Sequence, residues 1–179
     1  MNKHLLVIGA VSIMVLSACG NNAVEEAPVH MDHAEMEHSS SGELPPGLQV
    51  AANPTYKVGS HAIIQSDHMP GMDGATATIV GAFDTVAYAV SYTPTTGGPR
   101  VTNHKWVVHE ELAESGTNPL APGTEVTIRA DHMHGMDGAA ATIDAAEHTT
   151  VYMIDFVPAT GGEVVRNHKW VTESELSPK

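Results

Sequence analysis

Hydrophobic and polar residues alternate along most of the chain beyond residue 59, with the period of two that is typical of β-strands. The alternating or β-branched segments stand at 77–80, 86–92, 126–129, 141–143 and 150–156. Gly and Pro fall between these segments, and Pro94–Pro99, with its Gly97-Gly98 pair, predicts a hairpin turn. A short acidic segment that ends at Leu112, and again at Leu176, predicts one helical turn after the last strand. The pattern therefore predicts an all-β fold.

The chain contains the same sequence twice. Residues 59–112 align with residues 123–176 at a constant offset of 64 residues and without a gap. About half of the aligned positions are identical, which indicates duplicated structural units. Because this period exceeds those of the common solenoid repeats, each unit is expected to be a small domain with its own core. We call the two units copy 1 and copy 2.

The predicted architecture is two tandem SH3-like β-barrels. Four or five short antiparallel strands in each copy must close on themselves or pack to bury one face, and a small barrel does so while removing exposed edges. Another compact β-roll would satisfy the same pattern. The expected organisation is a signal peptide at 1–18, a flexible linker at 19–52, a first barrel at 53–116 and a second barrel at 117–179.

The N-terminal residues are typical of an exported lipoprotein. Lys3 precedes an apolar run that ends at Leu16, and Leu16-Ser17-Ala18-Cys19 has the form of a bacterial lipobox. Processing at this motif would make Cys19 the new N-terminus and attach diacylglycerol to its sulfur. We therefore expect an extracytoplasmic protein that is anchored to the membrane by this lipid. Cys19 is also the only cysteine, which excludes disulfides and thiolate sites from the mature monomer.

The linker is expected to be disordered, because it has almost no large apolar side chains before residue 46. Within it lies an acidic tract with three His and two Met, namely His30, Met31, His33, Met36 and His38. A tract of this composition favours metal binding, and a solubilising spacer is the alternative. The formal net charge of the chain is −13, which attracts cations and excludes nucleic acid as a partner.

Each copy also carries soft metal ligands in a glycine-containing loop, Asp-His-Met-x-Gly-Met-Asp-Gly. The candidate ligands are His68, Met69, Met72, His132, Met133, His134 and Met136. Imidazole nitrogen and thioether sulfur suit copper, silver and other soft or borderline ions. His134 stands where copy 1 has Pro70, which favours copy 2 for an ion that also accepts nitrogen. Two other interpretations stay open: the Met side chains could fill the core, and His68 and His132 could anchor their loops.

Trp106 and Trp170 follow His104 and His168 by two residues, so each His and Trp should share one face of a strand. An indole beside the loop ligands could cap a bound monovalent cation. In the competing hypothesis, the same aromatic residues and the loops form a surface that binds cell-wall polymer or a partner protein.

The sequence gives no support for catalysis. It has no Gly-rich phosphate loop, no Gly-x-Ser-x-Gly and no His-Glu-x-x-His. The pair Glu110-Glu111 is expected to belong to a solvated tail. We predict a non-enzymatic protein whose only attached group is the lipid, with copper or another soft metal ion as the candidate ligand.

The repeated motifs give the chain a resemblance to the YdhK family of bacterial lipoproteins. They are Asp-His-Met-x-Gly-Met-x-Gly-Ala, Pro-x-x-Gly-Gly and Asn-His-Lys-Trp-Val, which stand at 67–75 and 131–139, 94–98 and 158–162, and 103–107 and 167–171. The resemblance covers nearly the whole chain. It implies a lipidated Cys19, an acidic linker and a tandem domain of uncharacterised function, in genes often associated with resistance to copper or other heavy metals.

Overall fold

The computed structural model describes residues 41–179, so the predicted signal peptide, Cys19 and the His/Met tract at 30–38 lie outside the described residues. Apart from two 3-10 turns, every regular element of residues 41–179 is a strand, which confirms the all-β class. The strands are β1 (Gln49–Val50), β2 (His61–Ile64), β3 (Thr76–Tyr92), β4 (Val101–Val108), β5 (Leu112–Ala113), β6 (Glu125–Ile128), β7 (Ala140–Phe156), β8 (Val165–Thr172) and β9 (Leu176–Pro178). The turns are η2 (His109–Glu111) and η3 (Glu173–Glu175).

Two long strands, β3 and β7, form the centre of the sheet. Each has 17 residues, and they pair antiparallel from Ala77 opposite Phe156 to Tyr92 opposite Ala141. The sequence predicted two short strands in this part of each copy, but the intervening residues continue the extended backbone. The register shifts at two places, which indicates β-bulges that bend the pair.

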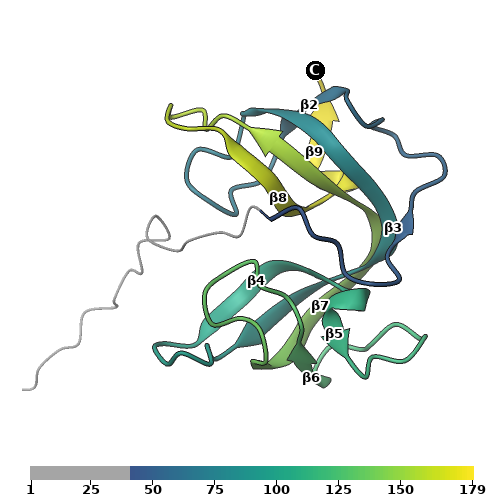
Figure 1. Cartoon of the computed structure of the whole chain (residues 1–179), viewed down its shortest axis with the longest axis vertical. Helices are drawn as coiled ribbons and strands as arrows, with labels where there is room; N and C mark the ends of the chain where they lie inside the picture. The colour runs from purple at the N-terminus through teal and green to yellow at the C-terminus, as the bar shows by residue number, and fades with distance from the viewer. Residues whose placement is uncertain (1–40) are drawn as a thin grey trace, which may run out of the picture. The chain divides into compact units, whose positions relative to one another are not determined.

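The halves of the two copies are exchanged between two lobes. In lobe A, β2 pairs with the first half of β3 and with β9, and β8 pairs with the second half of β7. In lobe B, β6 pairs with the first half of β7 and with β5, and β4 pairs with the second half of β3. Figure 1 shows these two groups of strands, with β3 and β7 running through both. Each lobe therefore combines the first half of one copy with the second half of the other.

Each lobe has a hydrophobic core to which both copies contribute. The core of lobe A includes Ile64, Met72 and Ile79 from copy 1 and Tyr152, Ile154 and Phe156 from copy 2. The core of lobe B includes Tyr88, Val90 and Tyr92 from copy 1 and Ile128, Met136 and Ile143 from copy 2. The expectation that each copy has its own core is therefore wrong, because β3 and β7 carry the second half of each copy onto the first half of the other. The predicted boundaries at 53–116 and 117–179 stay a prediction.

A third hydrophobic cluster joins the lobes. It contains Phe83 and Met153 from the central strands, Trp106 from β4 and Trp170 from β8. The Phe83 and Trp170 rings meet edge to face, with centroids 5.7 Å apart. This central cluster fixes β4 of lobe B against β8 of lobe A.

Several local predictions are confirmed. The segment after β3 returns the chain antiparallel into β4, with Gly97 and Gly98 at φ of 84° and 105°, a region that favours glycine. The predicted helical turns are η2 and η3. The strands form an antiparallel sheet whose main path runs β5-β6-β7-β3-β2-β9. Closure of this sheet into barrels stays a prediction. In residues 41–179, no helix has the length and apolar character needed to cross a membrane.

Candidate functional site

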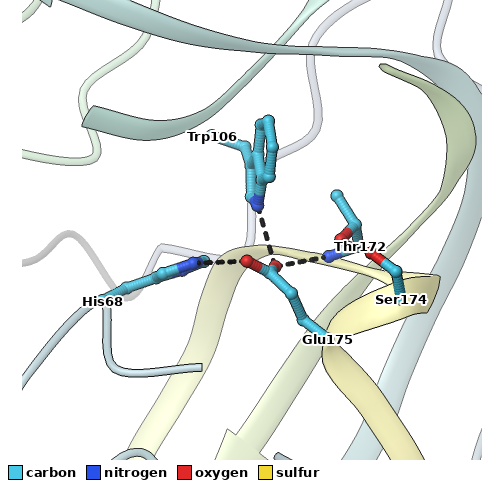
Figure 2. Close-up of polar contacts among 5 residues, drawn as sticks. All are labelled: His68, Trp106, Thr172, Ser174 and Glu175. Atoms are coloured by element: carbon cyan, nitrogen blue, oxygen red, sulfur yellow. Dashed lines mark hydrogen bonds and ion pairs between the residues drawn. The ribbon is translucent and has the colours of Figure 1, made fainter. Parts of the chain in front are cut away.

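A buried polar cluster joins His68, Glu175 and Trp106, and we call it the His68 triad. His68 Nε2 lies 2.8 Å from Glu175 Oε1, and Trp106 Nε1 donates a hydrogen bond of 2.8 Å to Glu175 Oε2. The backbone N–H of Thr172 donates to the same Oε2 at 3.0 Å. Figure 2 shows the three groups converging on the one carboxylate. Both oxygens of Glu175 are therefore engaged.

The equivalent residues form a second cluster, the His132 triad. His132 Nε2 lies 2.7 Å from Glu111 Oε1, and Trp170 Nε1 donates to Glu111 Oε2 at 3.0 Å. The backbone N–H of Val108 donates to the same Oε2 at 3.0 Å. In both triads the His and Trp belong to one copy and the Glu to the other. The His and Glu share a lobe, and the Trp reaches across from the other lobe.

The two turns fix the position of each glutamate. Glu111 and Glu175 end η2 and η3, and each side chain folds back to the N–H that precedes its turn, as in one half of a capping box. Their backbone carbonyls also accept hydrogen bonds, from the N–H of Arg129 at 2.7 Å and the N–H of Gln65 at 2.8 Å. Arg129 and Gln65 each precede a triad His by three residues. The backbone therefore holds each His loop beside its glutamate.

The glutamates are buried, ionised acceptors. Glu111 is 3% exposed and Glu175 is 9% exposed. Burial raises the pKa of Glu111, but His132 and the hydrogen bonds from Val108 and Trp170 outweigh burial and lower the pKa below its usual value. Burial also raises the pKa of Glu175, but His68 and the hydrogen bonds from Thr172 and Trp106 outweigh burial and lower this pKa below its usual value. The expectation that Glu111 lies in a solvated tail is therefore wrong.

Within residues 41–179, the second ring nitrogen of each triad His has no hydrogen-bond partner. Nδ1 of His68 and Nδ1 of His132 are buried, and neither has a hydrogen-bond partner in the described part of the chain. An unpaired buried polar atom costs about 1–3 kcal/mol, so it calls for an explanation. Proteins orient metal-binding imidazoles by pairing one ring nitrogen with a carboxylate, which leaves the other nitrogen for the ion. The two triads have this arrangement.

Residues of both triads, His68 and Glu175 of one and His132 of the other, line one pocket with a volume of about 470 Å³. Its walls include His68, His104, His132, His168, Met133 and Glu175. The four His occupy two pairs of equivalent positions in the copies, so both lobes contribute to the pocket. The ring centroids of His104 and His132 are 6.5 Å apart. Lys105 and Lys169 also line the pocket.

The Met residues of the predicted loop sites are not gathered around their His. Met72 and Met136 are completely buried in the cores of lobes A and B, and Met69 packs against the core of lobe A. The soft ligands of the first loop therefore do not converge on the surface, and the core-packing interpretation describes Met72 and Met136.

Copy 2 contributes one Met to the pocket. Met133 is 4% exposed and lines the pocket, and its sulfur accepts a hydrogen bond of 3.9 Å from the Tyr92 hydroxyl. His134 is exposed and is not part of the pocket wall. Its replacement of Pro70 therefore adds no nitrogen ligand to this pocket.

Both Trp side chains are buried, and the predicted role of an aromatic cap stays a prediction. Trp106 is 6% exposed and Trp170 is 0% exposed, and both lie in the central cluster. Their indole N–H groups donate to the buried glutamates. The peptide bonds Lys105–Trp106 and Lys169–Trp170 are cis. Neither indole is available as an exposed binding surface.

Sequence reasoning missed Glu111 and Glu175 as site residues. One signal was present: the copies differ in the residues just before these positions, His109-Glu110 against Glu173-Ser174, yet both retain Glu followed by Leu. A solvated tail has no reason to retain that pair.

Among residues 41–179, no group of three or more His, Cys, Asp or Glu side chains is already gathered where a metal ion could sit. The pocket wall offers imidazoles from both copies and one thioether, namely those of His68, His104, His132, His168 and Met133.

Comparison with known proteins gives a consistent result. The family model described as "Protein of unknown function (DUF1541)" matches residues 58–109 and 122–173. The "Uncharacterized protein YdhK" of Bacillus subtilis (strain 168) is 54% identical over 185 residues, which cover 99% of this chain and 90% of the relative. The crystal structure of a DUF1541 family protein (ydhK) from Bacillus subtilis has 57% identity and a TM-score of 0.77, covering 84% of this chain and 99% of that chain. The solution structure of the ydhK C-terminal domain from Bacillus subtilis has 60% identity and a TM-score of 0.65, and the match covers 69% of this chain and 93% of that chain.

Proposed function

The chain belongs to the DUF1541 family, which includes YdhK, and we propose that it binds soft or borderline metal ions, copper foremost, outside the cytoplasmic membrane. In this proposal Cys19 carries the lipid anchor, and the protein buffers the ion or hands it to another carrier. It performs no catalysis. The family's function is unknown, so the proposal depends on the chemistry of the site.

The observation that carries the proposal is the pair of carboxylate–imidazole contacts. Each leaves an unpartnered, buried Nδ1 on a ring that lines the shared pocket. A purely structural His would be expected to pair its second nitrogen with a carbonyl or a hydroxyl. A ligand nitrogen must keep its lone pair free for the ion.

The other pocket residues support a soft ion. His104 and His132 have ring centroids 6.5 Å apart, close to the roughly 6 Å that results when one ion bridges two ring nitrogens with bonds of about 2.0 Å. Met133 adds a thioether to the same wall. Two imidazoles and a thioether form a low-coordinate soft site, which suits Cu(I) or Ag(I) better than Ca²⁺ or Mg²⁺.

The position of Gly42 supports a second element of the proposal, transfer of the ion between the tract at 30–38 and the pocket. A Cβ on Gly42 would lie 2.9 Å from Nδ2 of Asn167, and His168 of the pocket follows Asn167. Gly42 lies four positions after His38, so this connection spans at most about 14 Å. Chain length therefore permits the tract to reach the pocket.

The test is a titration of the chain from residue 19 onward, carrying Cys19→Ser to remove the thiol. Cu(I) is added anaerobically in competition with a chromogenic chelator, and Cu(II) by calorimetry. We compare a pocket variant, His68→Ala/His132→Ala, with a tract variant in which His30, His33 and His38 are replaced by Ser. Each is expected to lose part of the Cu(I) capacity.

The matched control is His61→Ala, because His61 is an exposed residue of β2 and does not line the pocket. It should bind Cu(I) as the parent does. A parent chain that binds Cu(I) and Cu(II) no more tightly than the combined pocket and tract variant would overturn the proposal. The competing hypothesis needs exposed aromatic residues for a polymer-binding surface. Both Trp side chains are buried, so they cannot form that surface.

A further inference from the structure

We infer that Glu111 and Glu175 are positioning residues: each holds the His of the other copy in the Nε2–H tautomer, so that Nδ1 is the atom presented for metal binding. This inference rests on the proposed function and goes beyond it, because it assigns the ligating atom and the residue that selects it. It also predicts that a substitution in one copy changes the ligand of the other.

The other hydrogen bonds of each glutamate show that the His is the donor in the His–Glu contact. Oε2 of Glu175 accepts two N–H donors, from Trp106 and from the Thr172 backbone, and Oε1 faces Nε2 of His68. An ionised carboxylate has no hydrogen to donate, so the proton of the 2.8 Å contact must be on Nε2. The same reasoning places the proton on Nε2 of His132, opposite Glu111.

The tautomer then determines which nitrogen can bind an ion. A neutral imidazole has one N–H and one lone pair, so a proton on Nε2 leaves the lone pair on Nδ1. Nδ1 is also the nitrogen that has no hydrogen-bond partner within residues 41–179, in both His68 and His132. The opposite tautomer would bury an unpaired N–H in each triad and would leave no lone pair at that atom.

An isosteric substitution reverses this arrangement. In Glu175→Gln, the amide oxygen must take the Oε2 position, because Trp106 and Thr172 both direct N–H groups at it. The amide NH₂ then occupies the Oε1 position and donates to Nε2 of His68. His68 is thereby forced into the Nδ1–H tautomer, and its free lone pair is lost. Glu111→Gln acts in the same way on His132.

The effect crosses from one copy to the other. Glu175 belongs to copy 2 and orients His68 of copy 1, and Glu111 of copy 1 orients His132 of copy 2. Each glutamate also accepts a hydrogen bond from a Trp of the opposite lobe. The two His therefore depend on residues more than 20 positions away in sequence, and for His68 the separation is 107 residues.

The experiment measures the tautomers directly in the metal-free chain from residue 19 onward with Cys19→Ser. Long-range ¹H–¹⁵N correlation spectra at neutral pH distinguish Nε2–H, Nδ1–H and doubly protonated rings. We expect Nε2–H for His68 and His132 in the parent. Glu175→Gln should switch His68 alone, and Glu111→Gln should switch His132 alone. Glu163→Gln, at an exposed position, should switch neither.

A second readout is the affinity for Ag(I), measured in the same variants by competition. Loss of an orienting carboxylate is expected to weaken binding about 10–100-fold, whereas Glu163→Gln should leave the affinity unchanged. Nδ1–H or doubly protonated rings in the parent would overturn the inference, and that measurement does not depend on any variant folding. Tautomers that switch as expected, in a parent that binds neither Cu(I) nor Ag(I), would support the positioning role and overturn the proposed function.

Discussion

At the scale of single residues, the most informative feature is a buried carboxylate whose two oxygens both accept hydrogen bonds. Glu111 is 3% exposed, and it accepts hydrogen bonds from Val108 and Trp170 and contacts His132. A buried charge is tolerated only when its lone pairs are satisfied in this way. The glutamate therefore holds both the η2 turn and the triad.

Removal of this carboxylate should be strongly destabilising. In Glu111→Ala, the indole N–H of Trp170 and the N–H of Val108 lose their acceptor in a buried site. We expect the free energy of unfolding to fall by about 3–5 kcal/mol, because each buried N–H group left without an acceptor costs about 1–3 kcal/mol. Urea denaturation followed by circular dichroism measures it. The control Glu163→Ala removes an exposed carboxylate and should change stability by less than about 0.5 kcal/mol. Similar losses in both variants would contradict the role given to Glu111.

The lowered pKa values of Glu111 and Glu175 predict acid sensitivity. A carboxylate whose pKa is lower in the folded state stabilises that state fully above its unfolded pKa of about 4.3. The stability is lost as pH falls through the folded pKa. The metal-free protein should therefore lose stability as the pH falls below about 4.3, and Glu111→Gln should show a smaller loss over that range. Urea midpoints measured between pH 3 and 7 test this, and equal pH slopes would contradict it.

At the scale of elements, the long strands β3 and β7 depend on bulges and on a close approach at Gly81. A Cβ at Gly81 would lie 2.6 Å from Cε2 of Phe83, whose ring is buried in the central cluster. Copy 2 has Ala145 at the equivalent position, where the counterpart of Phe83 is Glu147. The strand itself therefore accepts alanine, and the Phe83 ring is what requires glycine.

Gly81→Ala should lower the free energy of unfolding by about 1–3 kcal/mol through overpacking. A double-mutant cycle with Phe83→Leu identifies the cause, because shortening Phe83 should remove most of the penalty of Gly81→Ala. Chemical denaturation of the four proteins gives the coupling energy. Additive effects of the two substitutions would show that Phe83 is not the reason for the glycine.

The sequence predicts local elements well and their partners poorly. Alternation predicted parts of β3 and β7 and nearly all of β6, the glycine pair predicted the β3–β4 turn, and the acidic segments predicted η2 and η3. It did not reveal that Met72 and Met136 belong to the cores, because a thioether suits a core and a soft metal equally. It also did not place Glu111 and Glu175 beside His132 and His68, since that contact depends on which copy packs with which.

At the scale of the molecule, the exchange of halves between the lobes is the decisive property. The two copies have nearly the same strand pattern, so the pattern alone does not say whether the first half of a copy packs on its own second half or on that of the other copy. Local periodicity contains nothing that distinguishes the two pairings. The antiparallel β3–β7 pair selects the exchanged pairing, because it places the second half of each copy beside the first half of the other.

The exchange predicts that neither copy folds alone as a monomer. Fragment 41–116 lacks Tyr152 and Phe156, which fill the core around its Ile64, and fragment 117–179 lacks Tyr88 and Tyr92 for the same reason. Each fragment purified separately should give a poorly dispersed ¹H–¹⁵N spectrum at low concentration, or a dimer in which two identical fragments replace the two copies. Mixed in equal amounts, they should form a one-to-one complex whose spectrum resembles that of the intact chain, with the mass checked by light scattering. A folded monomer of either fragment would contradict the exchanged topology, because it would require a core closed within one copy.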